Sequence, residues 1–279
     1  MNIAIIPARS GSKRISRKNI KDFCGKPILA YAISAAKNAR IFDKIIVSTD
    51  STEIQAIAVD LGADSPHLRE KYSDDFATTI EVLAYEAERL GLQKSDSVCC
   101  IYPCSPLLQS EFLKKGFEKF LQNQNSYIFS ACEYNSNPLR SFFIKDDKIQ
   151  MLAEYFGNSS LTQSSRELEK SSFDRQQVLS HSDFSAQPTN LAQDTRIACA
   201  NSHQALDSIN LATIRSQDLE TLYYDAGQFY FGSVENFLAK KPIFSKDSMI
   251  VKIPQIYVVD INTNEDWEIA ELKYKILAG

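Results

Sequence analysis

The chain of 279 residues has few of the residues that build metal or disulfide sites, and it has no long apolar run. Its three histidines are scattered and its six cysteines include no Cys-x-x-Cys pair, so a structural zinc site is not expected. No stretch approaches the roughly 20 apolar residues of a membrane-spanning helix, and the apolar start is too short for a signal peptide. These absences favour a cytoplasmic protein with reduced cysteines and no membrane partner.

Glycine and proline are also scarce, with nine of each, whereas 44% of the residues are hydrophobic and 24% are charged. This composition excludes collagen-like, wholly disordered and disulfide-scaffold chains. The net charge of −4 gives the whole surface no general attraction for nucleic acids or anionic membranes. The length is compatible with one domain or two.

The charge is nevertheless distributed unevenly along the chain. Residues 1–26 carry seven Lys and Arg against the single acid Asp22, whereas acidic residues outnumber basic ones in the remainder. The cations gather in the segment PARSGSKRISRKN, directly after a short apolar run. Backbone amides at a glycine turn together with Arg and Lys suit a triphosphate, although the glycines of a Walker A loop are missing. A solvated basic loop or an RNA-contact patch is the alternative interpretation.

Short apolar runs rich in β-branched residues alternate with amphipathic segments. The pattern predicts strands at 2–7, 44–49, 97–102, 126–132, 249–253 and 257–261, and helices at 27–37, 52–61, 78–91, 109–123 and 265–277. Such alternation is typical of a three-layer α/β fold, in which helices cover both faces of a mainly parallel sheet. Because ligands of these sheets bind at the carboxyl ends of the strands, the loops after Pro7, Thr49 and Tyr102 are the expected site.

The amino-acid composition of the chain changes after Met151. Residues 157–193 are rich in Ser, Thr, Asn and Gln and show little periodicity, which is typical of an insertion or a partly disordered arm. We therefore predict a catalytic domain formed by residues 1–151 and 213–279, interrupted by a Ser/Gln-rich insertion at 152–212.

Several segments resemble a known family. The string IIPARSGSKRISRKNIKDFCGKPILAYAI resembles the opening of the CMP-nonulosonate synthetases, which are cytidylyltransferases that activate sugars. The later motifs TIRSQDL, DAGQFYFG and DINTNEDW, which begin at Thr213, Asp225 and Asp260, resemble the pseudaminic acid branch more than the sialic acid branch. The resemblance implies a Rossmann-like αβα fold of the nucleotide-diphospho-sugar transferase type, with a small dimerisation arm that is exchanged within a homodimer.

The resemblance also implies a reaction. In this family a hydroxyl of a nonulosonic acid attacks the α-phosphorus of CTP and releases pyrophosphate with the aid of Mg²⁺, for glycosylation of flagellin or surface glycans. Three alternatives stay open: the same chemistry on N-acetylneuraminic or legionaminic acid, a CTP-binding regulator that has lost catalysis, and an RNA-binding module.

The resemblance assigns nine residues to CTP and its transfer. Around the basic loop it implies catalytic Arg9 and Lys18 on the phosphates, with Ala8, Gly11, Ser12 and Asn19 lining the turn or touching the ribose. For the cytosine it implies Arg69, Ala77 and Thr79. A pocket with correctly aimed hydrogen-bonding groups rejects uracil because the wrong base leaves buried groups unpaired. For Thr79 the alternative role is an ordinary helix N-cap.

A second group is implied for the sugar: Tyr102, Ser105, Arg215, Gln217, Gln228 and Tyr230. Tyr102 stands where the sialic acid branch has a glutamine, and Arg215 would pair with the sugar carboxylate. Independently of the resemblance, strand alternation places Gln228 and Tyr230 on one face, with Phe229 and Phe231 toward the core. Cys104 is not expected to act as a nucleophile, because the family's chemistry needs none and the few histidines offer no obvious base.

Metal binding is implied for Asp260 and Asn262. The expected strand before Asp260 would aim its carboxylate at the carboxyl end of the sheet, and Mg²⁺ prefers such hard oxygen ligands together with substrate phosphates. The family usually has Asp-x-Asp at this position, whereas this chain has Asp-Ile-Asn, so Asn262 is a neutral and weaker ligand. The alternative is that Asp260 only caps the last helix.

Overall fold

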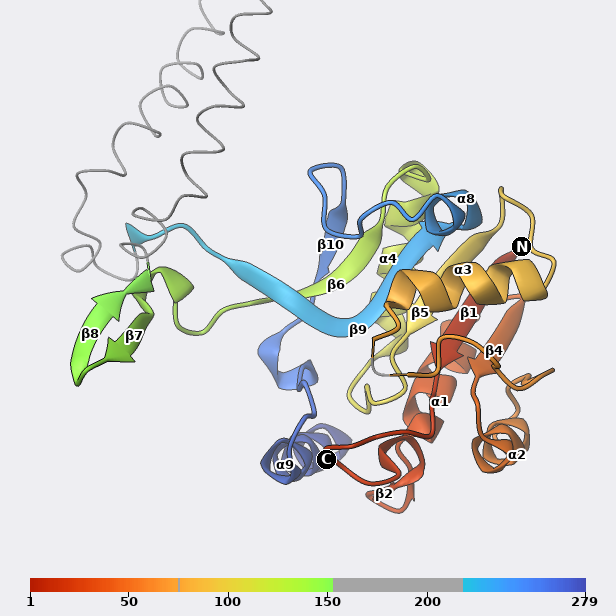
Figure 1. Ribbon diagram of the computed structural model, residues 1–279, viewed down its shortest axis with the longest axis horizontal. Helices are drawn as coiled ribbons and strands as arrows, with labels where there is room; N and C mark the ends of the chain where they lie inside the picture. Colours follow the sequence, from red (N-terminus) through yellow and green to blue (C-terminus); the bar gives the residue numbers. More distant parts are fainter. Residues whose placement is uncertain (75, 153–217) are drawn as a thin grey trace, which may run out of the picture. The chain divides into compact units, whose positions relative to one another are not determined.

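The computed structural model describes residues 1–74, 76–152 and 218–279. It divides into two compact units, Met1–Glu133 with Tyr223–Gly279 and the segment Tyr134–Leu222. The larger unit contains a six-stranded sheet in the order β10-β6-β9-β5-β1-β4 (Figure 1). The strands are β1 (Asn2–Pro7), β4 (Lys44–Ser48), β5 (Ser97–Ile101), β6 (Ile128–Glu133), β9 (Tyr223–Ser233) and β10 (Met249–Lys252).

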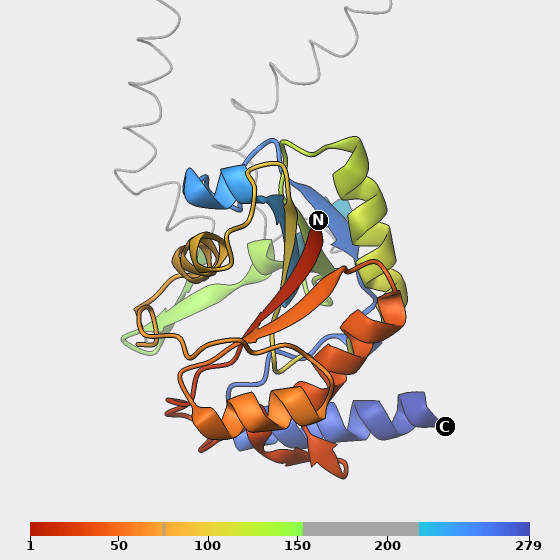
Figure 2. The ribbon, with the colours of Figure 1, turned by 90° about the vertical axis from the view of Figure 1, so that its right-hand side faces the viewer.

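All strand pairs of this sheet are parallel except those of β9, which runs antiparallel to β5 and β6. The mainly parallel mixed sheet expected from the sequence is therefore confirmed. Helices cover both of its faces (Figure 2). They are α1 (Leu29–Ala39), α2 (Thr52–Asp60), α3 (Thr79–Arg89), α4 (Ser110–Gln122) and α8 (Val234–Leu238). The last helix, α9 (Asn264–Ala278), does not contribute to the cores of the sheet faces.

Each face of the sheet has its own apolar core, and β1 contributes to both. Ala4 and Ile6 pack in the cluster that includes α1 and α4, whereas Ile3 and Ile5 pack in the cluster that includes α3 and α8. Strands covered on both faces read as continuous apolar runs in the sequence rather than as alternating ones.

Strand β9 shows the same double burial. Phe229 and Phe231 lie in the first cluster, as the strand alternation predicts, and Tyr230 lies in the second. Tyr230 is nevertheless as buried as its neighbours, because β9 is a central strand with helices over both of its faces. The Tyr230 ring is therefore part of the core, and its hydroxyl donates to the carboxylate of Asp225.

A threonine is the N-cap residue of two helices, α3 and α9. Thr78 caps α3 and forms a capping box with Glu81, and Thr263 caps α9 in the same way with Asp266. The alternative roles considered for Thr79 and Asp260 as helix caps are therefore wrong. Both side chains are left available for other contacts.

The strand expected at 257–261 is also absent from this described segment. A short 3-10 helix, η4 (Gln255–Tyr257), stands there instead, and extended backbone without a ladder partner leads to Asp260. The N–H of Val258 donates to the carbonyl of Gln255. The Lys273 ammonium donates to the carbonyls of Gln255 and Val258 at 2.8 Å each. These local partners satisfy the groups that a strand would have paired in a sheet.

A third apolar cluster lies between α9 and a small hairpin formed by β2 (Asp22–Phe23) and β3 (Lys26–Pro27). Phe23 makes edge-to-face contacts with Tyr31, Trp267 and Tyr274. This packing connects the end of the basic loop, which includes the 3-10 helix η1 (Lys18–Ile20), to the carboxyl-terminal helix.

The described part of the smaller unit contains the 3-10 helix η2 (Pro138–Arg140) and the hairpin of β7 (Phe142–Lys145) and β8 (Lys148–Met151). Asp146 and Asp147 both have positive φ, as a two-residue hairpin turn requires. The two strands pair only with each other. The first segment of the larger unit therefore ends at Glu133 rather than near residue 151. Apart from Leu152, the expected insertion lies outside the described residues.

No helix among the described residues is long and apolar enough to cross a membrane.

The close packing of Gly232 yields a stability prediction. A Cβ at this position would lie 2.6 Å from Cε1 of Tyr127 and 2.9 Å from Cε2 of Phe237, both in the buried core. We expect Gly232→Ala to lower the free energy of unfolding by about 1–3 kcal/mol, measured by urea denaturation. If the ring contact is the cause, Tyr127→Leu in the Gly232→Ala background costs less than it does alone. Additive losses would contradict this explanation.

Candidate active site

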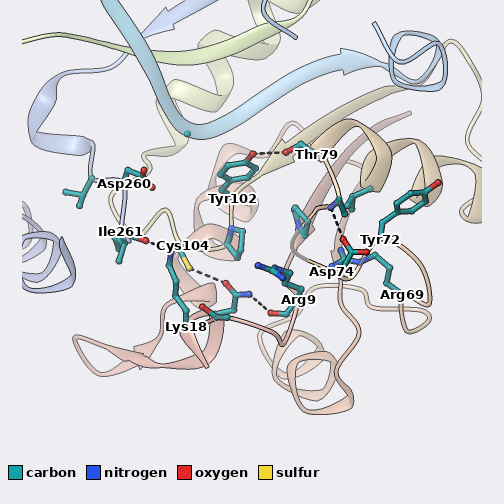
Figure 3. A pocket seen from close by; sticks show the side chains of 18 residues that line it. Arg9, Lys18, Arg69, Tyr72, Asp74, Thr79, Tyr102, Cys104, Asp260 and Ile261 are labelled. Carbon is teal, nitrogen blue, oxygen red and sulfur yellow. Dashed lines mark hydrogen bonds between the residues drawn. The ribbon is translucent and has the colours of Figure 1, made fainter. Parts of the chain in front are cut away.

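A cavity of about 320 Å³ opens at the carboxyl ends of β1 and β5 (Figure 3). Its walls include the loops after Pro7 and Tyr102, two of the three positions at which the sequence predicts a site. Nine of the predicted residues line it: Arg9, Ser12, Lys18, Asn19, Arg69, Ala77, Thr79, Tyr102 and Asp260. Residues from both halves of the chain thus converge on one pocket.

The basic loop is held against the sheet by contacts at both of its ends. The backbone N–H and the hydroxyl of Ser10 donate to the carboxylate of Asp50, which follows β4, at 2.7 and 2.9 Å. Asn19 donates its side-chain amide to the carbonyl of Arg9, and the Lys18 ammonium donates to the carbonyl of Ile261. These contacts place the cationic side chains of Arg9 and Lys18 in the same cavity.

Arg69 forms a buried wall of the pocket, with only 4% of its surface exposed. Its backbone N–H donates to the carbonyl of Thr49, and its Nη1 donates to the carbonyl and hydroxyl oxygens of Ser48 at 3.2 and 3.0 Å. Burial lowers the pKa of this guanidinium, although it stays a cation at neutral pH. The side chain is therefore fixed before any ligand binds.

Hydroxyl groups occupy another wall of the cavity. Thr79, the first residue of α3, and Tyr102, directly after β5, are hydrogen-bonded through their hydroxyls at 2.7 Å. The Tyr102 ring packs on Tyr230, whose hydroxyl donates to the carboxylate of Asp225. Burial raises the pKa of both tyrosines, so they are neutral and can donate hydrogen bonds at physiological pH.

Asp260 brings a carboxylate to the cavity. It is exposed, and its Oδ2 accepts from Nδ2 of Asn262 at 2.6 Å. The side-chain Oδ1 of Asn262 in turn accepts from Nη1 of Arg14. Asn262 therefore orients Asp260, and Arg14 already occupies one of the two lone pairs that its Oδ1 could offer to an ion.

These residues fit Mg²⁺ better than a transition metal. Across the described ranges, no three His, Cys, Asp or Glu side chains converge as a metal-ligand set. The Asp260 carboxylate in the same cavity as Arg9 and Lys18 is a donor set typical of Mg²⁺, which takes one or two carboxylates and completes its shell with water and phosphates.

Six other predicted residues do not line the cavity. Gly11 is one of them, and Ala8 is another, which is buried and donates its N–H to the carbonyl of Ser48. Ser105 and Tyr230 are buried, as is Gln228, whose Nε2 donates to the carbonyl of Tyr257 while its Oε1 has no hydrogen-bond partner in the described structure. Asn262 is the sixth. Arg215 and Gln217 lie outside the described residues.

Sequence reasoning did not single out several lining residues. They are Pro7, Tyr72, Asp74, Val82, Pro103, Gly227, Val259 and Ile261. Two carry a recognisable signal. Asp74 accepts the N–H groups of Phe76 and Ala77 at 2.9 Å, a turn typical of aspartate, and it thereby shapes the segment before α3. Gly227 has a φ of +60° within a bulge of β9, as a glycine inside a strand run suggests.

Cys104 lines the cavity, but its environment suppresses thiolate chemistry. Its thiol donates to Oδ1 of Asn19, and burial raises its pKa to about 12. We expect Cys104→Ser, which keeps a donor toward Asn19, to retain turnover within about twofold of the wild type. At pH 8 the native thiol should resist iodoacetamide, as mass spectrometry can measure. Rapid alkylation of Cys104, or loss of activity in the serine variant, would revive the nucleophile hypothesis.

The comparisons with known proteins agree with this geometry. The family described as cytidylyltransferase matches residues 3–263 of the chain. A pseudaminic acid cytidylyltransferase of Campylobacter jejuni is 34% identical over 99% of the chain and 97% of its own length. An N-acylneuraminate cytidylyltransferase of Streptococcus agalactiae is 26% identical over 95% of the chain and 51% of its own length.

Among solved structures, a CMP:2-keto-3-deoxy-manno-octonic acid synthetase complexed with CTP superposes with a TM-score of 0.59 over 99% of both chains. At 11% identity this likeness concerns the fold alone. The fold thus recurs in a protein of very different sequence.

Proposed function

Because the chain belongs to the cytidylyltransferase family, we propose that it transfers CMP from CTP to pseudaminic acid and releases pyrophosphate. The product of this reaction is CMP-pseudaminic acid. The observation that carries the proposal is 34% identity to a pseudaminic acid cytidylyltransferase over almost the full length of both proteins. The lower identity to the neuraminate enzyme, 26%, favours pseudaminic acid over sialic acid as the acceptor.

The basic side of the cavity suits the triphosphate. Arg9 and Lys18 bind the phosphates and neutralise the charge that develops on the leaving pyrophosphate, and Ser12 and Asn19 line the same wall. The buried guanidinium of Arg69 and the segment Ala77–Thr79 face the base. A rigid wall of this kind discriminates by leaving its own donors unpaired when the wrong base enters.

The hydroxyl side of the cavity suits the sugar. In the reaction the sugar hydroxyl oxygen bonds to the α-phosphorus as the bond from that phosphorus to the bridging oxygen of pyrophosphate breaks, and the hydroxyl proton is lost to solvent or a nearby base. Tyr102 and the backbone at Gly227 line the path by which the sugar approaches. Their role is to hold the attacking oxygen in line, because positioning supplies much of the catalysis in such transfers.

Asp260 is the residue that would hold Mg²⁺, with Asn262 keeping the carboxylate in place. When bound, the ion would supply charge neutralisation to the phosphates. The other acid of the lining, Asp74, already accepts the N–H groups of Phe76 and Ala77.

The proposal includes a cytoplasmic homodimer in which an arm is exchanged between subunits. The hairpin β7–β8 supports an interface, because Phe142, Phe143, Ile144 and Ile149 expose between 46% and 74% of their surface. Nucleic acid is not a proposed partner, since Arg9 and Lys18 line the cavity while Arg14 contacts Asn262 and Arg17 pairs with Glu53.

The reaction is tested by incubating the purified protein with CTP, Mg²⁺ and one sugar at a time, and measuring pyrophosphate release. We expect rapid release with pseudaminic acid and release slower by about tenfold or more with N-acetylneuraminic and legionaminic acids. Faster turnover of either of the latter sugars would reassign the acceptor. CTP binding without pyrophosphate release from any of the three would instead indicate a regulator.

The metal assignment predicts that Asp260→Asn lowers kcat by about 10²-fold or more, because a neutral amide replaces the only charged protein ligand proposed. The fold should persist, since the side chain is exposed and Thr263 caps α9. Circular dichroism and the melting temperature provide the control for folding. Near-native activity with normal Mg²⁺ dependence would remove Asp260 from the metal site.

A further inference from the structure

A carboxylate lies behind the pocket wall, on α3, and the proposed reaction does not use it. Glu86 has no exposed surface. Its Oε1 accepts a hydrogen bond of 2.7 Å from the hydroxyl of Ser48, and its Oε2 lies 2.9 Å from Nε2 of His67. Glutamate is almost never fully buried unless it is paired, so this position needs a reason.

The hydrogen bonds lead from Glu86 to the cavity in two steps. Ser48, the last residue of β4, donates its hydroxyl proton to Glu86 and accepts with the same oxygen from Nη1 of Arg69 at 3.0 Å. Nη1 also donates to the carbonyl of Ser48, and Nε donates to the hydroxyl of Ser73 at 3.4 Å. Within the described chain, these contacts leave both N–H groups of Nη2 for a ligand.

Helix α3 also fixes the backbone that carries Arg69. Arg89, which lies three residues after Glu86, donates from Nη1 to the carbonyl of Leu68 at 2.9 Å. The N–H of Arg69 donates to the carbonyl of Thr49 at 2.6 Å. The segment 67–69 is thus held at its backbone by α3 and β4 and at its side chains by Glu86 and Ser48.

Charge provides a second reason for the arrangement. Burial of the Arg69 guanidinium lowers its pKa, and among the charged groups around it the Glu86 carboxylate opposes this effect most strongly. Removing one member of a buried, hydrogen-bonded charge pair leaves the other uncompensated.

We propose that Glu86 is a positioning residue that sets nucleobase choice by holding Arg69, through the Ser48 hydroxyl, in the orientation that accepts cytosine. This inference rests on the proposed function, which places Arg69 at the base. Cytosine presents acceptors at N3 and O2 to a donor such as Nη2. Uracil presents an N–H at position 3 and leaves that donor unpaired.

The test separates the hydrogen bond from the charge. Ser48→Ala removes the connecting hydroxyl and keeps Glu86, whereas Glu86→Gln keeps an acceptor for Ser48 and removes the charge. Asp96→Asn is the matched control, because Asp96 is also a buried carboxylate but pairs with the amino terminus of Met1. For each folded variant, calorimetry gives the dissociation constants of CTP and UTP, and thermal melting gives stability.

We expect both site variants to weaken CTP binding by about tenfold and UTP binding by less than about twofold, which lowers the CTP preference by a factor of about five or more. Asp96→Asn should lower the melting temperature without changing the preference. The proposal is overturned if folded Glu86→Gln keeps the wild-type preference. Should Glu86→Gln not fold, an unchanged preference in Ser48→Ala overturns it.

The binding measurements need no sugar and no turnover. If the wild-type protein prefers CTP to UTP yet releases no pyrophosphate with any acceptor, the proposed reaction fails while the role of Glu86 is still tested. With active protein, the KM for CTP should rise in both site variants while kcat changes little, because Glu86 does not touch the reacting atoms.

Discussion

The structure depends on holding a strongly cationic loop at the carboxyl end of a parallel sheet. Arg9 and Lys18 line the same cavity, and like charges in such proximity repel one another unless the backbone that carries them is fixed. The fixing contacts use the Asp50 carboxylate at Ser10, the carbonyl of Arg9 and the carbonyl of Ile261. Residues as far apart in the sequence as Lys18 and Ile261 therefore have to be assembled before the cavity has this wall.

Helix α3 contributes to the cavity at two points. Its first residue, Thr79, contacts Tyr102, and its buried Glu86 accepts from Ser48, which in turn accepts from Arg69. A buried carboxylate adds little net stability compared with an apolar side chain of similar size. Its presence on this helix is better explained by the precise placement of a cation at the site than by folding.

Much of the fold could be predicted from the sequence because strands with two buried faces and capped helices have strong local signals. The segment 257–261 shows the limit: its Val and Ile residues favour a strand, but Lys273 and a 3-10 turn satisfy its backbone. The strand-end loops indicated where the cavity would lie, whereas its nine predicted lining residues came from the resemblance to a known family. Glu86 could not be found in this way, because its partners Ser48 and His67 are distant in sequence and it occupies an otherwise apolar helix face.

The pairing of β6 with β9 has a consequence for insertions into the chain. Glu133 and Tyr223 are register partners, so the chain leaves the larger unit and returns to it at adjacent positions of one antiparallel ladder. Any segment between them has its ends already brought together by the sheet, and the entropy of closing a longer loop grows only with the logarithm of its length. Lengthening the chain at this position therefore adds little entropic cost to the folding of the larger unit.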